Sequence, residues 1–452
     1  MFVKTICASD LIPLDSDVHT GGGTDATAAL QAALDEALTA GGVHLLMDGA
    51  ALISTLRVHS NTTIECLTPD CGFFQMPGTN RSLLTNADWA PYAPKNRHIS
   101  LIGGTYNQDC RHQLHDVQDD GDQLNGYPRD TVMNGRRWVM GLEFYGVENL
   151  LIRDVILRDF RTFALTVGGF RGVTIENVWL DLPGRLQAQN QDGFHFWGPG
   201  RFLNVRDVGG RVGDDFMNIG PDERDDVSSI TDVLVDGVIL DDADQAIRLL
   251  SHGTGRLDRV TIRNVTGTYR SFGFYINCWV PGERFGNFGN LLFENIDLRQ
   301  TAPNYTYRPP FLFSVGGNME SLTVRNLRHH LPADARALME IGLPFFDRRS
   351  RFPEENRPCI RHLLIDGLTI LEKGEAAREA SYLQIFGEVT HLALRDVTVL
   401  REPGEPQGGC LLSFQEAGHV QTLCLSDVFL HGIGLEENLR ADRMIRENVT
   451  LE

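Results

Sequence analysis

A four-residue phrase that recurs along the chain constrains the fold more than any other feature of the sequence. It consists of an apolar residue, a variable residue, then Asn, Asp or Gly, and a second apolar residue. The phrases begin at Ile152, Ile175, Val205, Val235, Ile262, Phe293, Val324, Ile365, Leu394 and Leu425. Successive phrases lie 23 to 41 residues apart, a spacing typical of repeat architectures.

The composition of each repeat favours short strands that end in tight corners. β-Branched apolar residues alternate with polar ones over a few positions, and Asn, Asp or Gly then suits a turn. Helical repeats would need long runs with a period of 3.6, which the sequence lacks, and leucine-rich repeats have a shorter, stricter period. We therefore predict an all-β fold, a right-handed parallel β-helix of roughly 10–12 coils.

The predicted β-helix is a single domain that spans residues 1–452, and four of its segments are expected to lie outside the regular coils. Residues 24–40 carry apolar residues at helical spacing and end at Gly41-Gly42, which predicts a helix inside an N-terminal cap, residues 1–45. A cap of this kind would cover the open end of the first coil. Residues 105–141 are polar and lack periodicity, so we expect a long loop that walls a cleft. Residues 343–358 are expected to form a second loop, and residues 434–452 a polar tail across the last turn.

Charge and cysteine usage limit the partners and the compartment. The chain carries 41 Lys and Arg against 60 Asp and Glu, a net charge of −19, which argues against nucleic acid or an anionic membrane as partner. The eight cysteines form no CxxC pair, which favours reduced thiols. The N-terminus has no apolar signal core and no stretch is long enough to span a membrane. We expect a cytoplasmic protein; the oligomeric state, including a homo-oligomer, is left open.

Three carboxylates are the strongest candidates for chemistry. Asp192 and the pair Asp214-Asp215 are separated by one repeat phrase. They should therefore lie on adjacent turns, where neighbouring strands are about 4.8 Å apart. Carboxylates that converge in this way are what acid/base cleavage of a glycosidic bond requires. The alternative is that these aspartates only form corners, as Asp and Asn do elsewhere in the chain.

Several residues near the acid clusters are candidates for binding a sugar. Arg248 could grip a sugar carboxylate or hydroxyl with two hydrogen bonds, or be a solvated outer charge. His252 could tune the acid cluster or be an ordinary loop histidine. If Phe194 and Phe196 point inward, their alternating neighbours face outward beside Asp192, where an exposed tryptophan could stack on a sugar. The candidate substrate-binding residues are Arg248, His252, His195, Trp197, Tyr275 and Trp279.

Over residues 20–300 the sequence resembles the polygalacturonase-like glycoside hydrolases of family 28, which have the pectin-lyase-like β-helix fold. Asn190-Gln191-Asp192 is similar to the family's Asn-Thr-Asp motif, and Gly213-Asp214-Asp215 matches its Gly-Asp-Asp motif. The opening segment, residues 24–42, resembles the family's capping helix. The resemblance implies that Asp214 is the general acid and that Asp192 and Asp215 position and deprotonate water, with inversion at the anomeric carbon.

Two departures from the family pattern bear on the substrate. The family's Gly-His-Gly turn should follow the double aspartate but is absent there, and whether His252-Gly253 replaces its histidine or is a coincidence stays open. Ala246-Ile247-Arg248-Leu249 resembles the Arg-x-Lys element, but Leu250 stands where the lysine belongs. Because that lysine is expected to bind the sugar carboxylate, both a neutral and a uronic sugar stay open.

We therefore expect a glycoside hydrolase that acts on an oligosaccharide, with no cofactor and no metal. The loop 105–141 would favour exo action if it closes one end of the cleft. Two alternatives stay open. One is a lyase or epimerase acting on uronate sugars, often with calcium, which acidic clusters can bind. The other is a non-catalytic carbohydrate-binding β-helix.

Overall fold

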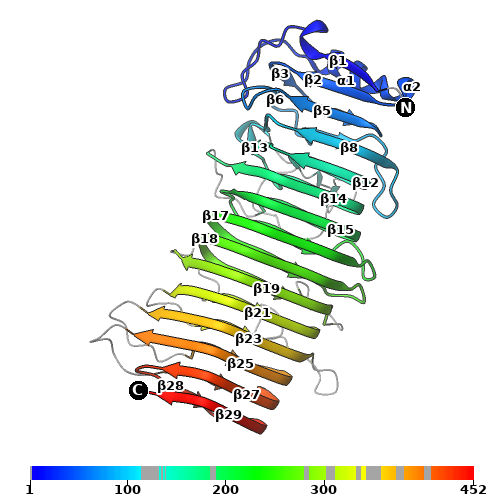
Figure 1. Ribbon diagram of the computed structural model, residues 1–452. Coiled ribbons are helices and arrows are strands. Elements are labelled where there is room, and N and C mark those ends of the chain that lie inside the picture. Colours follow the sequence, from blue (N-terminus) through cyan, green and yellow to red (C-terminus); the bar gives the residue numbers. More distant parts are fainter. Residues whose placement is uncertain are drawn as a thin grey trace. The chain divides into compact units, whose positions relative to one another are not determined.

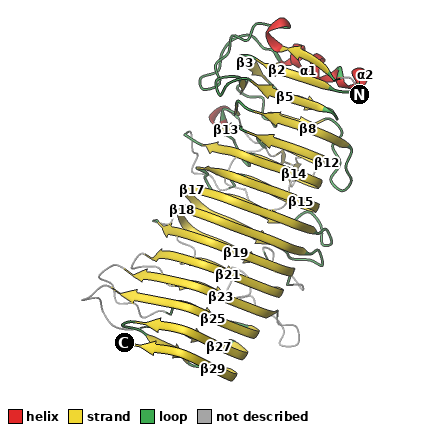
Figure 2. Ribbon diagram, viewed as in Figure 1, coloured by secondary structure: helices red, strands yellow, loops and turns green. Residues whose placement is uncertain are grey.

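The computed structural model describes residues 3–113, 132–133, 136–137, 139–183, 190–278, 285–301, 311–331, 337–342, 358–372, 381–401 and 409–452. The chain divides into two compact units, Met1–Asn218 and Ile219–Glu452. Within each unit the strands are stacked one beside the next (Figure 1), and strand is the dominant element (Figure 2). The fold is all-β, a right-handed parallel β-helix, as the repeat predicts. A single domain stays a prediction.

The first unit consists of short strands followed by longer ones. Its strands are β1 (Lys4–Cys7), β2 (Val43–Met47), β3 (Ala50–Ile53), β4 (Leu56–Val58), β5 (Thr62–Cys66), β6 (Gly72–Gln75), β7 (Leu84–Asn86), β8 (Asn96–Ile102), β9 (Thr105–Asn107), β10 (Val132–Met133), β11 (Arg136–Arg137), β12 (Leu142–Arg153), β13 (Ile156–Arg158), β14 (Leu165–Asp181) and β15 (Phe194–Gly210). The division between the units falls within β16 (Asp215–Gly220). Strand β12 pairs in parallel with β8 and β14, and β14 pairs with β15. The pair β10–β11 is antiparallel.

The second unit is built from two series of parallel strands. The long series is β17 (Ile230–Leu250), β18 (Leu257–Asn277), β19 (Asn287–Gln300), β21 (Asn318–Leu331), β23 (Cys359–Glu372), β25 (Glu388–Arg401), β27 (His419–Leu430) and β29 (Ala441–Leu451). The short series is β20 (Phe311–Val315), β22 (Ala337–Ile341), β24 (Leu383–Ile385), β26 (Cys410–Phe414) and β28 (Gly434–Glu437). Each strand pairs in register with the next member of its series.

The cap helix predicted over residues 24–40 is confirmed as two consecutive segments, α1 (Thr27–Asp35) and α2 (Ala37–Ala40). Gly41 ends the second segment in the left-handed conformation, with φ of 86°, where glycine avoids the steric cost of a Cβ atom. The apolar face of α1 contacts β2 and β4, and Leu30 and Leu34 are fully buried. None of the helices that the structure describes is long and apolar enough to span a membrane.

The corner residue of every repeat phrase adopts the left-handed conformation. Its φ lies between 48° and 82° in all ten phrases, from Asp154 and Asn177 to Asp396 and Asp427. Gly, Asn and Asp populate this region at the lowest cost, whereas other residues pay roughly 1–2 kcal/mol. The repeat therefore keeps a short polar residue or glycine at this position because the backbone must reverse its hand there.

The two apolar positions of each phrase form the core. All twenty of these side chains are 2% exposed or less, among them Ile175, Val205 and Ile262. Burying a side chain of this size stabilises the folded state by roughly 1.5–3 kcal/mol. Because successive phrases lie in register, each coil buries its neighbour's apolar edge.

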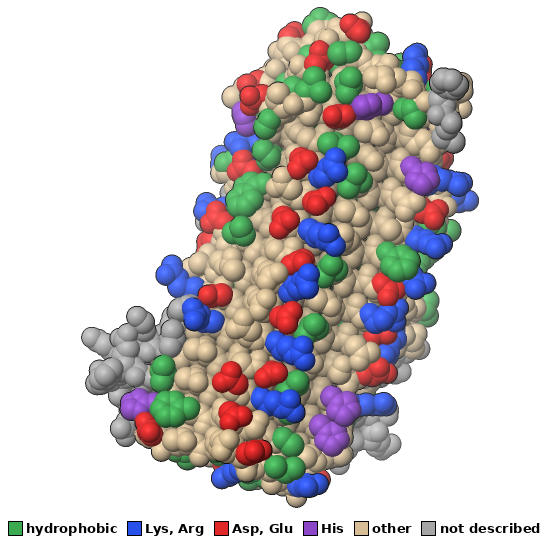
Figure 3. Space-filling view, in the orientation of Figure 1, with side chains coloured by type: hydrophobic (Ala, Val, Ile, Leu, Met, Phe, Trp, Pro, Cys, Tyr) green, Lys and Arg blue, Asp and Glu red, His purple; other side chains and the backbone are tan. Residues whose placement is uncertain are grey.

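Polar side chains on the outer face of the second unit are also in register. The amide of Asn295 donates to the Asn264 side-chain oxygen at 3.0 Å and accepts from Asn326 at 2.7 Å, which forms an asparagine ladder. Beside it, charges of opposite sign are paired from strand to strand in the order Asp236, Arg263, Glu294, Arg325, Asp366, Arg395. Figure 3 shows rows of red and blue side chains that alternate across the strands. The alternation avoids the repulsion that identical charges would suffer at strand spacing.

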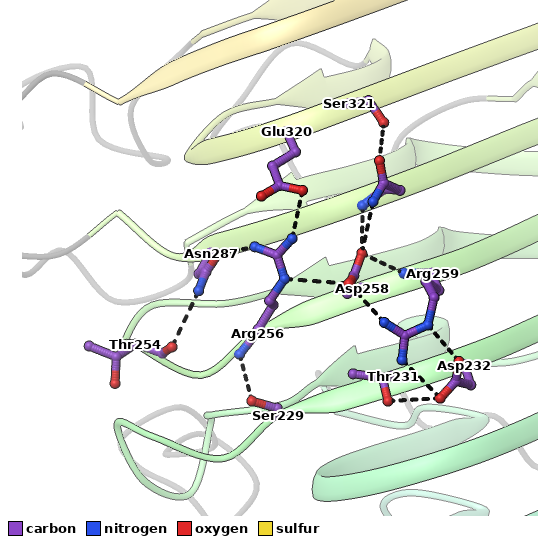
Figure 4. Close-up of polar contacts among 11 residues, drawn as sticks. Ser229, Thr231, Asp232, Thr254, Arg256, Asp258, Arg259, Asn287, Glu320 and Ser321 are labelled. Atoms are coloured by element: carbon purple, nitrogen blue, oxygen red, sulfur yellow. Dashed lines mark hydrogen bonds and ion pairs between the residues drawn. The ribbon is translucent and has the colours of Figure 1, made fainter.

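A second polar network lies near the starts of β17 and β18 (Figure 4). Arg259 forms ion pairs with Asp232 at 2.6 Å and with Asp258 at 3.0 Å, and Arg256 lies 3.4 Å from Asp258. Burial disfavours the Asp258 carboxylate, but hydrogen bonds from the N–H groups of Asn290 and Arg259 and the Arg256 charge outweigh it, so the pKa of Asp258 is lowered. This network ties the starts of consecutive coils together.

Two sequence predictions about segments need correction. Residues 434–452 do not run across the last turn as a tail. They contain β28 and β29, and β29 pairs with β27 because Met444 and Val449 continue the register of Leu423 and Val428. The predicted loop 105–141 begins with a strand, since β9 pairs with β6 and β13. The middle of that loop and residues 343–357 lie outside the described residues.

Substitution of Asn295 should separate its two contributions to stability, the left-handed corner conformation and the hydrogen bonds of the ladder. Asn295→Ala forces a Cβ-bearing residue without a polar side chain into the left-handed region and removes two hydrogen bonds. Asn295→Gly removes only the hydrogen bonds. We expect the alanine variant to lose about 1 kcal/mol more unfolding free energy than the glycine variant in urea denaturation. Equal losses would show that the left-handed conformation does not account for the preference for Asn, Asp or Gly at the corner position.

His419 should stabilise the last coils more at acid than at alkaline pH. His419 joins Glu388 and Asp442 at 3.0 Å each, and its pKa is raised chiefly by the hydrogen bond with Glu388. The stabilisation is complete below the unfolded histidine's pKa of about 6.5 and is lost as pH rises through the raised folded-state value. His419→Asn should therefore lower Tm more at acid than at alkaline pH. Glu388→Gln, the control, should reduce that difference.

Candidate active site

The two acidic motifs lie on adjacent coils, as their spacing predicts. The N–H of Gly213 donates to the Gln191 carbonyl at 2.8 Å, and the N–H of Gly193 donates to the Asp215 carbonyl at 2.8 Å. These bonds place Gln191-Asp192-Gly193 directly against Gly213-Asp214-Asp215. The approach is so close that a Cβ atom on Gly213 would lie 2.7 Å from the Gln191 Cβ. Glycine at this position therefore follows from the stacking of the two motifs.

All three aspartates are buried. Asp192 is 2% exposed, Asp214 7% and Asp215 1%. Neighbouring protein groups therefore surround their carboxylates. Acidic side chains in the interior are costly unless each is hydrogen-bonded or protonated.

Each motif is braced by specific polar contacts. The N–H of Asn190, which has a left-handed φ of 57°, donates to Asp214 Oδ2 at 2.8 Å. The amide of Gln191 is fully buried and donates to the Phe160 carbonyl at 2.9 Å, which anchors the first motif to the preceding coil. Asp192 Oδ2 lies 3.2 Å from His195 Nδ1. The N–H of Asn190 therefore orients the Asp214 carboxyl group.

The strand that follows the first motif buries both sets of its alternating side chains. Phe194 packs against Phe216, and Phe196 against Phe170, as expected for inward-facing residues. His195 lies beside Asp192, also as expected, but is only 6% exposed.

The exposed position predicted for Trp197 is wrong. The indole is 1% exposed and stacks on Tyr145 with ring centroids 6.0 Å apart, within a cluster that includes Met140 and Phe163. The reason is that β15 is covered on its outer face by aromatic residues of the preceding coils. In this structure the ring offers no open face for a sugar.

Sequence reasoning missed two uncharged residues that contact His195, the histidine beside Asp192. Asn218 in β16 hydrogen-bonds His195, and the ring of Phe163 stacks on the imidazole at 4.1 Å. The signal for Asn218 was a polar residue inside the otherwise apolar run Phe216–Ile219. Nothing in the local sequence marks Phe163, which comes from the preceding coil.

In the second unit, Arg248 and Leu250 lie two residues apart on β17. Arg248 is 8% exposed, and its guanidinium carbon lies 5.8 Å from the centre of the Tyr275 ring. Leu250, at the position of the family's lysine, is 1% exposed and packs with Phe272, Tyr275 and Phe311. This site is an apolar cluster. Tyr275 is fully buried and donates to the Cys278 carbonyl at 3.2 Å, and a role for it in substrate binding stays a prediction.

His252 belongs to a local network around Asp222. The Asp222 carboxylate is fully buried and accepts hydrogen bonds from Ser251 Oγ at 3.2 Å and from the N–H of Gly253 at 2.7 Å. His252 Nδ1 lies 3.7 Å from it, and Nε2 lies 3.4 Å from Asp226. Burial raises the pKa of Asp222, and His252 opposes that shift. A role for His252 or Arg248 in binding substrate stays a prediction, and Trp279 lies outside the described residues.

Among the residues that the structure describes, no group of three or more His, Cys, Asp or Glu side chains is arranged to hold a metal ion.

Comparisons with known proteins find sequence similarity to polygalacturonases and structural similarity to parallel β-helix proteins. No family model matches the chain. Polygalacturonases of Gossypium barbadense and Gossypium hirsutum are each 25% identical over 190 residues, 40% of this chain and 44% of the relative. The match thus spans under half the length of those curated proteins.

Solved structures agree with the architecture. A hyperthermoactive exopolygalacturonase from Thermotoga maritima superposes with a TM-score of 0.54 at 13% identity, covering 98% of this chain and 92% of that one. A family 28 exopolygalacturonase from Yersinia enterocolitica gives a TM-score of 0.42 at 12% identity, covering 99% and 78%. At these identities the likeness concerns the fold alone. With the local sequence matches, it makes this chain a divergent, polygalacturonase-like β-helix protein.

Proposed function

We propose that the protein is a pectin-related glycoside hydrolase that cleaves a glycosidic bond by inverting acid/base catalysis. One observation carries the proposal. The motif Asn190-Gln191-Asp192 is hydrogen-bonded, backbone to backbone, to Gly213-Asp214-Asp215 on the next coil. That stacking lays the two acidic segments side by side on adjacent coils, which supports a site in which the three carboxylates act together.

The match to the family's motifs supports distinct roles for the aspartates. From the Gly-Asp-Asp match, Asp214 is the proposed general acid, which protonates the leaving oxygen. The N–H of Asn190 orients its carboxyl group by donating to Oδ2. Asp192 and Asp215 are the proposed groups that hold and deprotonate the attacking water.

A uronic substrate would need a cation to bind its carboxylate. Leu250 cannot supply one, because it is packed among Phe272, Tyr275 and Phe311. Arg248, two residues earlier on β17, is the proposed replacement, since a guanidinium can bind a carboxylate with two parallel hydrogen bonds.

The proposal is tested by Asp214→Asn with polygalacturonate and neutral oligosaccharides as substrates. We expect kcat to fall by about 10²–10⁴-fold, because the variant cannot donate the proton. Proton NMR of the wild-type reaction should show a product of inverted anomeric configuration. Product length then distinguishes exo from endo cleavage.

Asp207→Asn is the matched control. It makes the same chemical change at a left-handed corner, with φ of 50°, that lies outside the acid cluster, and it should leave kcat unchanged. Near-normal turnover by Asp214→Asn would show that Asp214 is not the general acid. An unsaturated, ultraviolet-absorbing product would show that the bond is cleaved by elimination and not by hydrolysis.

A further inference from the structure

A chain of three buried polar side chains runs out from the first acidic motif. His195 Nδ1 lies 3.2 Å from Asp192 Oδ2, and the Asn218 amide nitrogen hydrogen-bonds His195 Nε2. Asp192 is 2% exposed, His195 6% and Asn218 1%. The three residues come from the segment before β15, from β15 and from β16. All three belong to the first unit.

The imidazole is also held by rings. Phe163 stacks on it with centroids 4.1 Å apart and an interplanar angle of 22°. The Trp197 ring lies 4.7 Å away at 45°. With both ring nitrogens in hydrogen bonds and one face stacked, the orientation of the His195 ring is fixed.

The contacts also select a tautomer. The amide nitrogen of Asn218 can only donate, so Nε2 of His195 must accept, and the ring proton must reside on Nδ1. The Nδ1–H group then donates to Asp192. On the strands packed against the ring, the neighbours are Thr166 in β14, in register with His195, and Asn218 in β16, both uncharged. Asp192 lies beside the ring, and the titratable groups on the neighbouring strands include Asp215, which begins β16, and Glu143 on β12, in register with Thr166.

We propose that His195 is a positioning residue for Asp192, kept neutral and Nδ1-protonated by Asn218. The inference rests on the proposed hydrolase function and changes the predicted role of His195, which was substrate binding. A hydrogen bond to one carboxylate oxygen fixes the plane of the carboxylate and thereby the direction in which it faces the attacking water. A neutral donor also leaves Asp192 more basic than an imidazolium would, since an adjacent positive charge lowers the pKa of a carboxyl group.

The tautomer can be measured without any substrate. Nitrogen-15 NMR of the full chain, with the His195 signals assigned by their loss in His195→Phe, reports which ring nitrogen carries the proton. We expect a protonated Nδ1 and an unprotonated Nε2 at neutral pH. In Asn218→Asp, which is of equal size but negatively charged, both nitrogens should be protonated. An imidazolium or an Nε2–H tautomer in the wild-type protein would overturn the proposal.

Kinetics test the consequence for Asp192. His195→Phe keeps an aromatic ring against Phe163 but removes the donor, so kcat should fall about 10- to 100-fold with little change in KM. His195→Asn places an amide donor near the position of Nδ1 and should recover part of the loss. A purely structural role predicts the reverse order, with the phenylalanine variant the more active.

The pH profile gives a further readout. In Asn218→Asp the imidazolium should lower the pKa of Asp192, so the acidic limb of kcat should move to lower pH. An unmoved limb in a variant whose ring is shown by NMR to be charged would overturn the link to Asp192. If the wild-type protein hydrolyses no glycoside, the proposed function fails, while the NMR measurement still decides whether Asn218 sets the state of His195.

Discussion

In-register hydrogen bonding between successive parallel strands is the constraint on which the rest of the structure depends. A chain can return to the same register every 23 to 41 residues only if it bends in a fixed way at each corner. The left-handed residue of each phrase provides that bend. Because Asn, Asp and Gly tolerate this conformation best, one of these three residues recurs at the corner of each repeat.

The same register decides what happens on the surfaces. Equivalent positions of successive coils are brought to strand spacing, so like charges would repel and like amides can bond. The chain uses both effects in the second unit, where Asp236, Arg263 and Glu294 alternate in sign and Asn264, Asn295 and Asn326 form a ladder. These outer rows contribute to stability and specify the register, and they leave the other faces of the coil available for chemistry.

The candidate active site is a local consequence of stacking rather than of a separate motif. Backbone bonds from Gly193 and Gly213 bring two acidic segments together, and the missing side chain at Gly213 permits that approach. The carboxylates are then buried, which makes their uncharged neighbours as important as the acids themselves. Asn190 hydrogen-bonds Asp214, His195 hydrogen-bonds Asp192, and Asn218 hydrogen-bonds His195. Phe163 and Trp197 pack against the imidazole that contacts Asp192.

The sequence by itself determined the coil, its corners, the cap helix and the pairing of Asp192 with Asp214 and Asp215 on adjacent turns. These features are local or periodic, so spacing and residue type suffice to predict them. Only the tertiary structure decided that Trp197 and Tyr275 are buried and that Leu250 lies in an apolar cluster. It also decided that Asn218 and Phe163 contact His195. The burial of a side chain on the outer face of a coil depends on residues from other coils that cover it, and a single strand's alternation carries no information about them.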